Sequence, residues 1–457
     1  MNFLFYDTET TGVNVAFDQI VQFAAIVTDE NFVELGRLNI RCRLLPWIVP
    51  SPVALLVTNT SPRNLTDPDL PSHFEMMAKI KAWLSRWQPS VFVGYNSMKF
   101  DEILLHRAFW QTLNPPYVTV TNGNSRLDLL PVIRALSVLR PEALDIPLND
   151  RGTKTFKLDR LAPANGFVSH NAHDALGDVE ATIFLARRVA ERAPDFWKTL
   201  SRRTLKSAVS SVLTPEKLIY ILGNSPSTPQ MLWAQRVDRH SNTSDAIVAD
   251  LAFDWKRLES DHEDENATPE STYSQHLRTV SFNKSPVFFT LDEAEELFSE
   301  SPTQEIIFQS ALWKKADWIE GLSEAVDKRA ARSTERTPEL EETIYDGFAD
   351  KLDACLMDRF QRSDWPERSE IANEFSDNRF RRLAVRIVYA SAPSLLTEQE
   401  KSRMDVAIQE RFRTPPETEV PWRSIASAQA ELEAAKKQWG EQEGYSEIER
   451  WISRLHH

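Results

Sequence analysis

The first two hundred residues alternate short apolar runs with segments whose apolar residues recur at helical spacing. Runs rich in β-branched and aromatic residues predict strands at residues 2–9, 19–28, 37–45 and 90–95, the first three as antiparallel neighbours. Helical spacing predicts helices at residues 77–87, 102–113, 127–139 and 174–193. Strands followed by strands interleaved with helices predict an α/β domain with a mixed sheet over residues 1–200.

The pattern changes after residue 200. Strand-like runs at residues 218–222, 231–237, 246–251 and 279–289 predict a small β domain over residues 201–335, with an acidic loop at 259–272. A charged stretch at residues 327–337 has the composition of a linker. From there to residue 457 the pattern is helical, with interruptions expected at prolines 366, 393, 415 and 416 and helices at 424–437 and 446–455.

The predicted first strand ends in two acidic residues, Asp7 and Glu9. Alternate residues of a strand point to the same face, so the two carboxylates share a face. Like charges this close repel one another, and a cation bound between them relieves the repulsion. Oxygen ligands of this kind suit Mg²⁺ or Mn²⁺. The alternative is a solvated strand end, where Asp and Glu are common.

Two further acids and a histidine stand at predicted helix starts. Asp101 follows the apolar run 90–95, and taken alone it is more simply interpreted as the N-cap of the next helix. Asp178 lies one turn inside the helix predicted from residue 174, for which Asp174 fits the N-cap, and His173 stands just before that helix.

The composition excludes several classes of protein. The chain has 457 residues, and its 53 Lys and Arg against 67 Asp and Glu give a net charge of −14, ordinary for a globular multidomain protein. With Cys42 and Cys355 as its only cysteines, a disulfide framework and a Cys-based zinc site are excluded. No apolar run reaches the roughly 18 residues of a membrane helix, and the first residues lack the basic region of a signal peptide. We therefore expect a soluble, cytoplasmic protein without membrane contact.

Three motifs in order resemble those of the DEDDh exonuclease superfamily. They are Asp-x-Glu at residues 7–9, Asn-x-x-x-Phe-Asp at 96–101 and His-x-x-x-x-Asp at 173–178. Further stretches are similar to the bacterial exodeoxyribonuclease I family, at residues 94–96, 124–130, 139–142, 169–175, 283–287, 344–348 and 375–379. The resemblance implies an α/β, RNase H-like exonuclease domain (1–200), a small SH3-like β domain (201–335) and a C-terminal all-helical domain (336–457).

The resemblance also implies a role for each motif residue. Asp7, Glu9, Asp101 and Asp178 would bind two Mg²⁺ ions, with Mn²⁺ as a substitute and Asp7 as the bridging ligand. His173 would be the general base that deprotonates the attacking water. The implied activity is 3′→5′ hydrolysis of single-stranded DNA to 5′-mononucleotides, in DNA repair and recombination.

Other positions match family contacts to the DNA strand. Glu9 would also lie near the terminal sugar, Tyr117 would stack on a base, and Arg134 and Lys157 would contact phosphates. A core tyrosine, a helix-surface arginine and a solvated lysine are the alternative interpretations, because such residues are common anywhere.

Four positions depart from the family pattern. In the loop 56–62, Asn59 replaces a glycine and can still adopt a left-handed conformation, whereas Thr60 replaces a wedge isoleucine. At two predicted substrate-binding positions His106 and Thr121 stand where an arginine and a tryptophan are expected. These differences predict a looser grip on the strand and unchanged chemistry.

The implied partners are single-stranded DNA and the acidic C-terminal tail of single-stranded DNA-binding protein, bound to a monomer of this chain. Arg140 would bind the tail carboxylate through bidentate hydrogen bonds, the alternative being a surface arginine without a partner. The DNA groove would be lined by basic residues at 202, 203, 206, 284, 314, 315, 379, 381, 382 and 386, which predicts strongly salt-dependent binding.

Two other functions also fit the motifs. A DEDDh exonuclease that prefers RNA or acts in proofreading would share the site, although the two additional predicted domains argue against it. A catalytically silent scaffold that binds single strands on a nuclease fold is expected to have lost at least one of the five site residues, and none is missing here.

Overall fold

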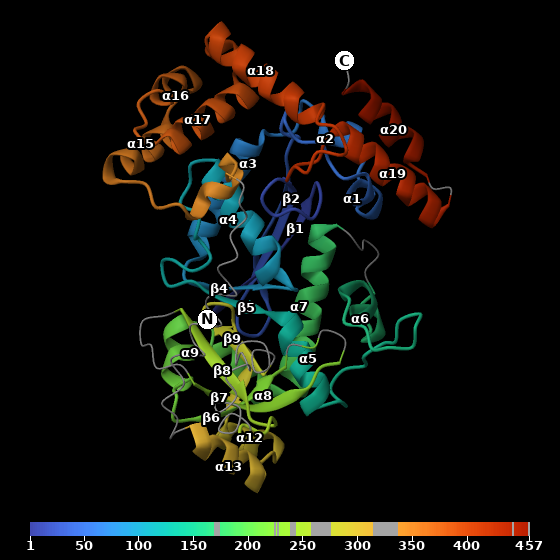
Figure 1. The fold of residues 1–457 in the computed structure, drawn as a ribbon, viewed down its shortest axis with the longest axis vertical. Helices are drawn as coiled ribbons and strands as arrows, with labels where there is room; N and C mark the ends of the chain where they lie inside the picture. The colour runs from blue at the N-terminus through green and yellow to red at the C-terminus, as the bar shows by residue number, and fades with distance from the viewer. Residues whose placement is uncertain are drawn as a thin grey trace, which may run out of the picture.

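The computed structural model describes residues 1–168, 174–223, 225, 228–237, 244–256, 276–313, 337–440 and 443–455. In Figure 1 the N-terminal domain lies at the centre, a β domain lies below it, and the C-terminal helices arch over the top. The predicted acidic loop 259–272 and nearly all of the predicted linker 327–337 lie outside the described residues. The predicted domain boundaries therefore stay predictions.

The N-terminal domain is built on a five-stranded sheet in the order β3-β2-β1-β4-β5. β1 pairs antiparallel with β2 and β2 with β3, while β4 runs parallel to β1 and β5 parallel to β4. This mixed sheet is the one expected of an RNase H-like fold. The strands are β1 (Asn2–Thr10), β2 (Ile20–Thr28), β3 (Glu34–Arg41), β4 (Ser90–Gly94) and β5 (Ser125–Asp128).

The start of one predicted helix is wrong. The helix expected from residue 127 begins at Leu129, because residues 125–128 form β5 at the edge of the sheet. A strand of four residues is too short to show an alternating pattern in the sequence.

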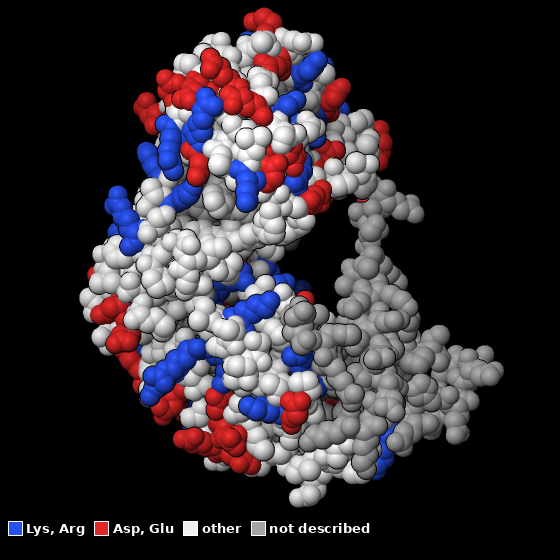
Figure 2. All heavy atoms as spheres, turned by 90° about the vertical axis from the view of Figure 1, so that its left-hand side faces the viewer, with Lys and Arg blue, Asp and Glu red and all other residues white. Residues whose placement is uncertain are grey.

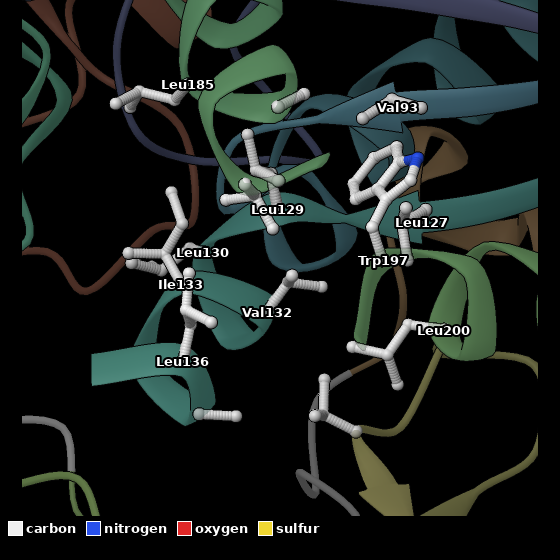
Figure 3. Close-up of a cluster of buried hydrophobic side chains, with 14 of the residues drawn as sticks. Val93, Leu127, Leu129, Leu130, Val132, Ile133, Leu136, Leu185, Trp197 and Leu200 are labelled. Carbon is white, nitrogen blue, oxygen red and sulfur yellow. The ribbon is translucent and has the colours of Figure 1, made fainter. Parts of the chain in front are cut away.

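Helices cover both faces of the sheet. α5 (Leu129–Leu139), α6 (Leu158–Ala164), α7 (Ala175–Arg192) and α8 (Pro194–Arg202) cover the face that carries Phe3 and Phe5. α3 (His73–Leu84) and α4 (Asp101–Gln111) cover the opposite face, which carries Leu4 and Tyr6. Figure 3 shows the first of these cores, where Val93 and Leu127 of the sheet meet Leu129, Trp197 and Leu200. Short helices join these elements: α1 (Pro52–Val57), α2 (Pro62–Leu65), η1 (Ser85–Trp87) and η2 (Ser97–Lys99).

The β domain follows α9 (Lys206–Val212) and has a second five-stranded sheet, all antiparallel, in the order β10-β6-β7-β8-β9. The predicted strand 279–289 is divided by a turn into β9 and β10. The strands are β6 (Leu218–Leu222), β7 (Met231–Arg236), β8 (Asp245–Asp250), β9 (Leu277–Ser281) and β10 (Phe288–Thr290), followed by α12 (Leu291–Phe298) and α13 (Gln304–Trp313). The antiparallel sheet confirms a β domain, and its SH3-like character stays a prediction.

The C-terminal domain is helical, as predicted. The interruption predicted at Pro366 is the break at residues 363–364, and Pro366 stands in the first turn of the helix that follows, where its missing N–H costs nothing. The domain packs on the exonuclease domain through Phe74 against Phe360, and through Leu55 against Ile425. Its elements are η3 (Leu340–Tyr345), α15 (Lys351–Arg362), α16 (Trp365–Ile371), α17 (Asn378–Ser391), η4 (Pro393–Leu395), α18 (Glu398–Phe412), α19 (Ile425–Trp439) and α20 (Tyr445–Arg454). Over the described residues, no helix is long and apolar enough to cross a membrane.

Candidate active site

The end of β1 presents different polar residues on its two faces. Asp7 and Glu9 continue the face on which Phe3 and Phe5 are buried beneath α7. Thr8 points to the other face, beneath α4. The strand therefore delivers two carboxylates to one helical layer and a hydroxyl to the other.

Asp178 in the first turn of α7 joins the two carboxylates of β1. Oxygen atoms of Asp7, Glu9 and Asp178 all lie within 4.8 Å of one another. α7 packs on both β1 and β2, which places its N-terminal turn over the end of β1. The structure thus brings together three of the four acids that were predicted to bind metal.

Asp101, the fourth predicted ligand, approaches from the opposite side of the sheet. It is the first residue of α4 rather than its N-cap, and its Oδ1 accepts a hydrogen bond from Thr8 Oγ1 at 2.6 Å. The chain reaches it through a tight turn after β4, where Asn96 has a φ of +60° and a Cβ on Gly94 would overlap the side chain of Ser97. Asp101 lies close enough to raise the pKa of Asp7 without belonging to the group of three.

The electrostatics of the group favour a bound cation. Burial, followed by Asp101, Asp178 and Glu9, raises the pKa of Asp7 well above its usual value. Burial and the charges of Asp178 and Asp101 raise the pKa of Glu9 to about 8, while the charge of Arg41 acts in the other direction. Burial raises the pKa of Asp101 to about 6.

The donor set fits a hard divalent ion. Carboxylate oxygens this close to one another, with no lysine or arginine described among them, match the ligand chemistry of Mg²⁺ or Mn²⁺. Asp7, Glu9 and Asp178 are the residues that would hold such an ion, and Asp101 borders the same strand end.

His173 lies outside the described residues, in the segment 169–173. Asp174, predicted to cap α7, makes no side-chain capping bond. Its Oδ1 instead accepts hydrogen bonds from Gln22 Nε2 and from Arg41, each at 2.8 Å. The carboxylate therefore ties the start of α7 to β2 and β3.

A cavity of about 450 Å³ opens beside the three acids. It is lined by Asp178 together with Arg134 and Lys157, two of the predicted DNA contacts. Arg134 Cζ lies 5.6 Å from the ring centroid of Phe156, and its Nε is buried without a hydrogen-bond partner. Lys154, which also lines the cavity, was missed because a lysine in a polar loop carries no signal in the sequence.

The other predicted DNA contacts lie around the loop after α4. The Tyr117 ring meets the His106 ring edge-on, with centroids 5.2 Å apart. His106 is 7% exposed and its Nε2 lies 3.0 Å from Thr119 Oγ1, so it is packed inside the domain. Thr121 is exposed and its hydroxyl donates to the Tyr117 carbonyl.

In the loop at residues 56–62, Asn59 has the expected left-handed conformation, with a φ of +48°. Thr60 is buried, and its hydroxyl accepts a hydrogen bond from Thr58 at 2.9 Å. The side chain at this position is therefore turned into the loop.

Asp128, at the end of β5, is a residue whose role the sequence did not reveal. Its carboxylate accepts hydrogen bonds from the backbone N–H groups of Asn96 at 2.8 Å, Met98 at 3.3 Å and Leu130 at 3.1 Å. It therefore fixes the turn that leads to Asp101. Its place in the similar stretch 124–130 was the available signal.

Three of the ten basic residues predicted to line a DNA groove are paired with acids in the structure. Arg203, Arg379 and Arg386 form ion pairs with Glu293, Asp377 and Glu341, respectively. Lys314 and Lys315 lie outside the described residues. Figure 2 nevertheless shows the molecule hollowed between its two lobes, with Lys and Arg side chains on the floor of the hollow.

Arg140, the predicted partner contact, is exposed at the end of α5. Its guanidinium donates a hydrogen bond to the carbonyl of Leu297 and lies 5.6 Å from the ring centroid of Phe298. It is thus oriented by the β domain.

Two family models match the chain. Residues 4–186 match the family described as Exonuclease, and residues 338–455 match the Exonuclease I C-terminal domain, together more than half of the chain. Exodeoxyribonuclease I of Haemophilus influenzae is 32% identical over 308 residues, covering 63% of this chain and 64% of that protein. The Escherichia coli protein of the same name is 33% identical over 263 residues, covering 56% and 55%. The chain aligns with less than two thirds of either curated relative.

Solved structures of the same group share the whole fold. The zinc-bound form of an E. coli exonuclease I–single-stranded DNA complex superposes with a TM-score of 0.82 at 23% identity, covering 100% of this chain and 99% of that one. A structure described as SSB/exonuclease I in complex with the inhibitor CFAM gives a TM-score of 0.82 at 23% identity and covers 99% of both chains. In sequence and in overall fold the chain is therefore similar to the exodeoxyribonuclease I proteins.

Proposed function

We propose that this protein is a divalent-metal-dependent 3′→5′ exonuclease that degrades single-stranded DNA to 5′-mononucleotides in DNA repair and recombination. The observation that carries the proposal is the convergence of Asp7, Glu9 and Asp178 within 4.8 Å at the end of β1. The curated relatives are named for the same activity, and one solved relative is a complex with single-stranded DNA.

The chemistry divides between the acids and the residues beside them. Asp7, Glu9 and Asp178, with Asp101 nearby, would hold two Mg²⁺ ions, for which Mn²⁺ is a substitute. Bound ions of this kind supply activation of water, polarisation of the phosphate and stabilisation of the leaving 3′-oxygen.

The protein's own groups would bind the strand and move the proton. Arg134 and Lys157, in the cavity next to Asp178, would hold the phosphates of the last nucleotides. Glu9 would lie near the terminal sugar, and Tyr117 would stack on a base. His173, five residues before Asp178, would accept the proton of the attacking water at a ring nitrogen.

A protein partner of acidic character is part of the proposal. Arg140 would bind the C-terminal carboxylate of single-stranded DNA-binding protein, and one solved relative is described as a structure of SSB and exonuclease I. If Arg140→Ala binds an acidic tail peptide as tightly as the parent protein, this assignment fails.

The test of the activity is degradation of a 5′-labelled single-stranded oligonucleotide with Mg²⁺. We expect shortening from the 3′ end in the parent and none after EDTA treatment or in Asp178→Asn. Asp195→Asn removes an exposed carboxylate of the same domain and is the matched control. Intact DNA with tight binding by the parent would favour the silent scaffold, and faster degradation of RNA would favour the RNA-directed alternative.

A further inference from the structure

The loop that follows β1 is closed by a buried carboxylate. The register between β1 and β2 shifts directly after Glu9, so the position of the strand end depends on the loop at residues 11–18. In that loop Asp18 accepts hydrogen bonds from Thr11 Oγ1 and from the backbone N–H of Asn14, each at 2.8 Å. The loop therefore fixes the direction in which the chain leaves β1, two residues beyond Glu9.

Asp18 is tightly packed in this loop. Its side chain is 4% exposed, and a Cβ on Gly12 would come within 2.5 Å of its Oδ2. A carboxylate shielded from water in this way costs free energy unless hydrogen-bond donors and a cation satisfy it. Residues 11–18 contain no lysine or arginine, so the cation has to come from another part of the chain.

The C-terminal domain supplies this cation. Arg423, in the segment between α18 and α19, donates hydrogen bonds to Asp18 Oδ1 at 3.1 Å and to the carbonyl of Val49 at 3.3 Å. Its Nε donates to Glu431 of α19 at 3.1 Å. The Arg423 side chain is 18% exposed, so its ion pair with Asp18 is largely shielded from salt. One guanidinium thus joins the C-terminal domain to two segments of the exonuclease domain.

A second segment beside the strand end is held from the same domain. The backbone N–H of Ser51 donates to the Thr11 carbonyl at 2.7 Å, and the Ser51 hydroxyl donates to Glu431. α1 begins directly after Ser51 and packs on α19, while α2 packs on α20 (Figure 1). Ser61, the N-cap of α2, donates to Glu447 of α20 at 2.6 Å. The C-terminal helices therefore hold both the loop after β1 and the segment hydrogen-bonded to it.

We propose that Arg423 is a positioning residue through which the C-terminal domain holds the end of β1 in the geometry that binds metal, an inference that rests on the proposed function. Arg423 acts on Glu9 through Asp18 and the backbone of Thr11, and not by contact with the reacting atoms. Mg²⁺ requires oxygen ligands at about 2.0–2.1 Å in nearly octahedral geometry, so a small displacement of Glu9 weakens its binding. The C-terminal domain thus completes the active site of its neighbour.

The test measures binding of Mn²⁺ in the absence of DNA, followed by the electron paramagnetic resonance signal of the free ion. In Arg423→Gln we expect the Kd for Mn²⁺ to rise about tenfold, as for the loss of other residues that orient metal ligands. Arg423→Lys should bind Mn²⁺ more tightly than Arg423→Gln, because it keeps a cation beside Asp18. In the nuclease assay with Mg²⁺, kcat of Arg423→Gln should fall while KM for the oligonucleotide stays that of the parent, since no contact with the strand is lost.

A double-mutant cycle shows whether Arg423 acts through Asp18. Asp18→Asn removes the charge that Arg423 meets and keeps the shape of the side chain, so the double variant should bind Mn²⁺ no more weakly than the weaker single variant. Gln361→Ala is the matched control. Gln361 of α15 joins the same two domains by donating to the carbonyls of Thr112 and Leu113, at the end of α4 away from the acids, and its loss should leave the Kd for Mn²⁺ unchanged.

Circular dichroism checks that each variant is folded, and Asp18→Asn alone, with the same expected rise in Kd, serves if Arg423→Gln is not. Parent-like Mn²⁺ binding in folded Arg423→Gln, or losses that add in the double variant, would overturn the positioning role while leaving the nuclease intact. An equal rise in Gln361→Ala would overturn it too, because any loosened domain contact would then have the same effect. A raised KM with unchanged kcat would make Arg423 a strand contact instead. A parent protein that neither binds Mn²⁺ nor degrades DNA would overturn the proposed function as well.

Discussion

Glu9 and Glu341 are two carboxylates shielded from water whose surroundings act in opposite directions. At the end of β1, burial and the neighbouring acids raise the pKa of Glu9 to about 8. In η3, burial alone would raise the pKa of Glu341, but Arg386 and Arg411 outweigh it and lower the pKa to about 2. An acid matched by arginines holds the fold together, whereas three acids that raise one another's pKa values are arranged to bind a cation.

Glu341 also sits where the domains meet. Its Oε1 accepts hydrogen bonds from Arg386 at 2.9 Å and Arg411 at 2.6 Å, and its carbonyl accepts one from Arg107 of α4. The carboxylate that these arginines neutralise thus positions the C-terminal domain on the exonuclease domain.

The largest effect expected is on stability, in Glu341→Gln. Removing the carboxylate leaves Arg386 and Arg411 buried without this acidic partner. We therefore expect the free energy of unfolding, measured in urea, to fall by about 3–5 kcal/mol. Glu367→Gln, which removes an exposed partner of Arg359, should leave the unfolding transition unchanged. Parent-like stability of Glu341→Gln would show that the arginines do not depend on this acid.

The ion pairs of Glu341 with Arg386 and Arg411 also predict how the free energy of unfolding depends on pH. With a folded pKa of about 2 and an ordinary pKa of 4.5, the unfolded chain binds the proton more readily between these values. The contribution of Glu341, about 3 kcal/mol, is therefore fully present above pH 4.5 and is lost as the pH falls through 2. Unfolding curves across this window should converge for the parent and Glu341→Gln. A difference in stability between the parent and Glu341→Gln that stays constant across this pH range would contradict the lowered pKa of Glu341.

The next largest effect on stability is expected from Mg²⁺ bound to the acids at the end of β1. Because an ion relieves repulsion among Asp7, Glu9 and Asp178, saturating Mg²⁺ should stabilise the metal-free parent, by about 2.7 kcal/mol at one hundred times Kd. Differential scanning calorimetry with and without Mg²⁺ measures the gain. Asp7→Asn should remove the gain and Asp195→Asn should keep it. An equal gain in both variants would place the ion elsewhere.

The smallest effect is expected from Glu9→Gln without metal. Burial is the largest cause of the raised pKa of Glu9, and a glutamine at this position is buried as well. Only the repulsion between the acids is therefore removed, and we expect stability to rise by about 1 kcal/mol near pH 8. Urea unfolding in EDTA measures this change in stability. Its sign is opposite to that of the change expected for Glu341→Gln. A loss of stability would mean that the acids at the end of β1 do not repel one another, and the comparison would fail.

Much of the fold and part of the site were predictable from local pattern. The β-branched and aromatic runs at residues 2–9 and 19–28 predicted β1 and β2 as antiparallel neighbours, which the structure confirms. The period of two in a strand placed Asp7 and Glu9 on one face. The left-handed conformation of Asn59 followed from its residue type alone. These features depend on neighbours in the chain, so the sequence carries them.

The features that the sequence did not predict depend on contacts between residues that are far apart in the chain. The sequence could not show that Thr8 would hold Asp101 on the far side of the sheet, because the two are 93 residues apart. It also could not show that His106 would be buried against Thr119, or that Arg203, Arg379 and Arg386 would be bound to acids. Lys154 joined the cavity only through the path of its loop.

By itself, the sequence determined most of the strands, the order of the three acidic motifs and the shared face of Asp7 and Glu9, because backbone periodicity and residue type are local properties. Only the tertiary structure decided which acids lie next to other acids and which lie next to arginines, because the free energy of a charge depends on what is packed around it. The contrast between Glu9 and Glu341 belongs to that second class.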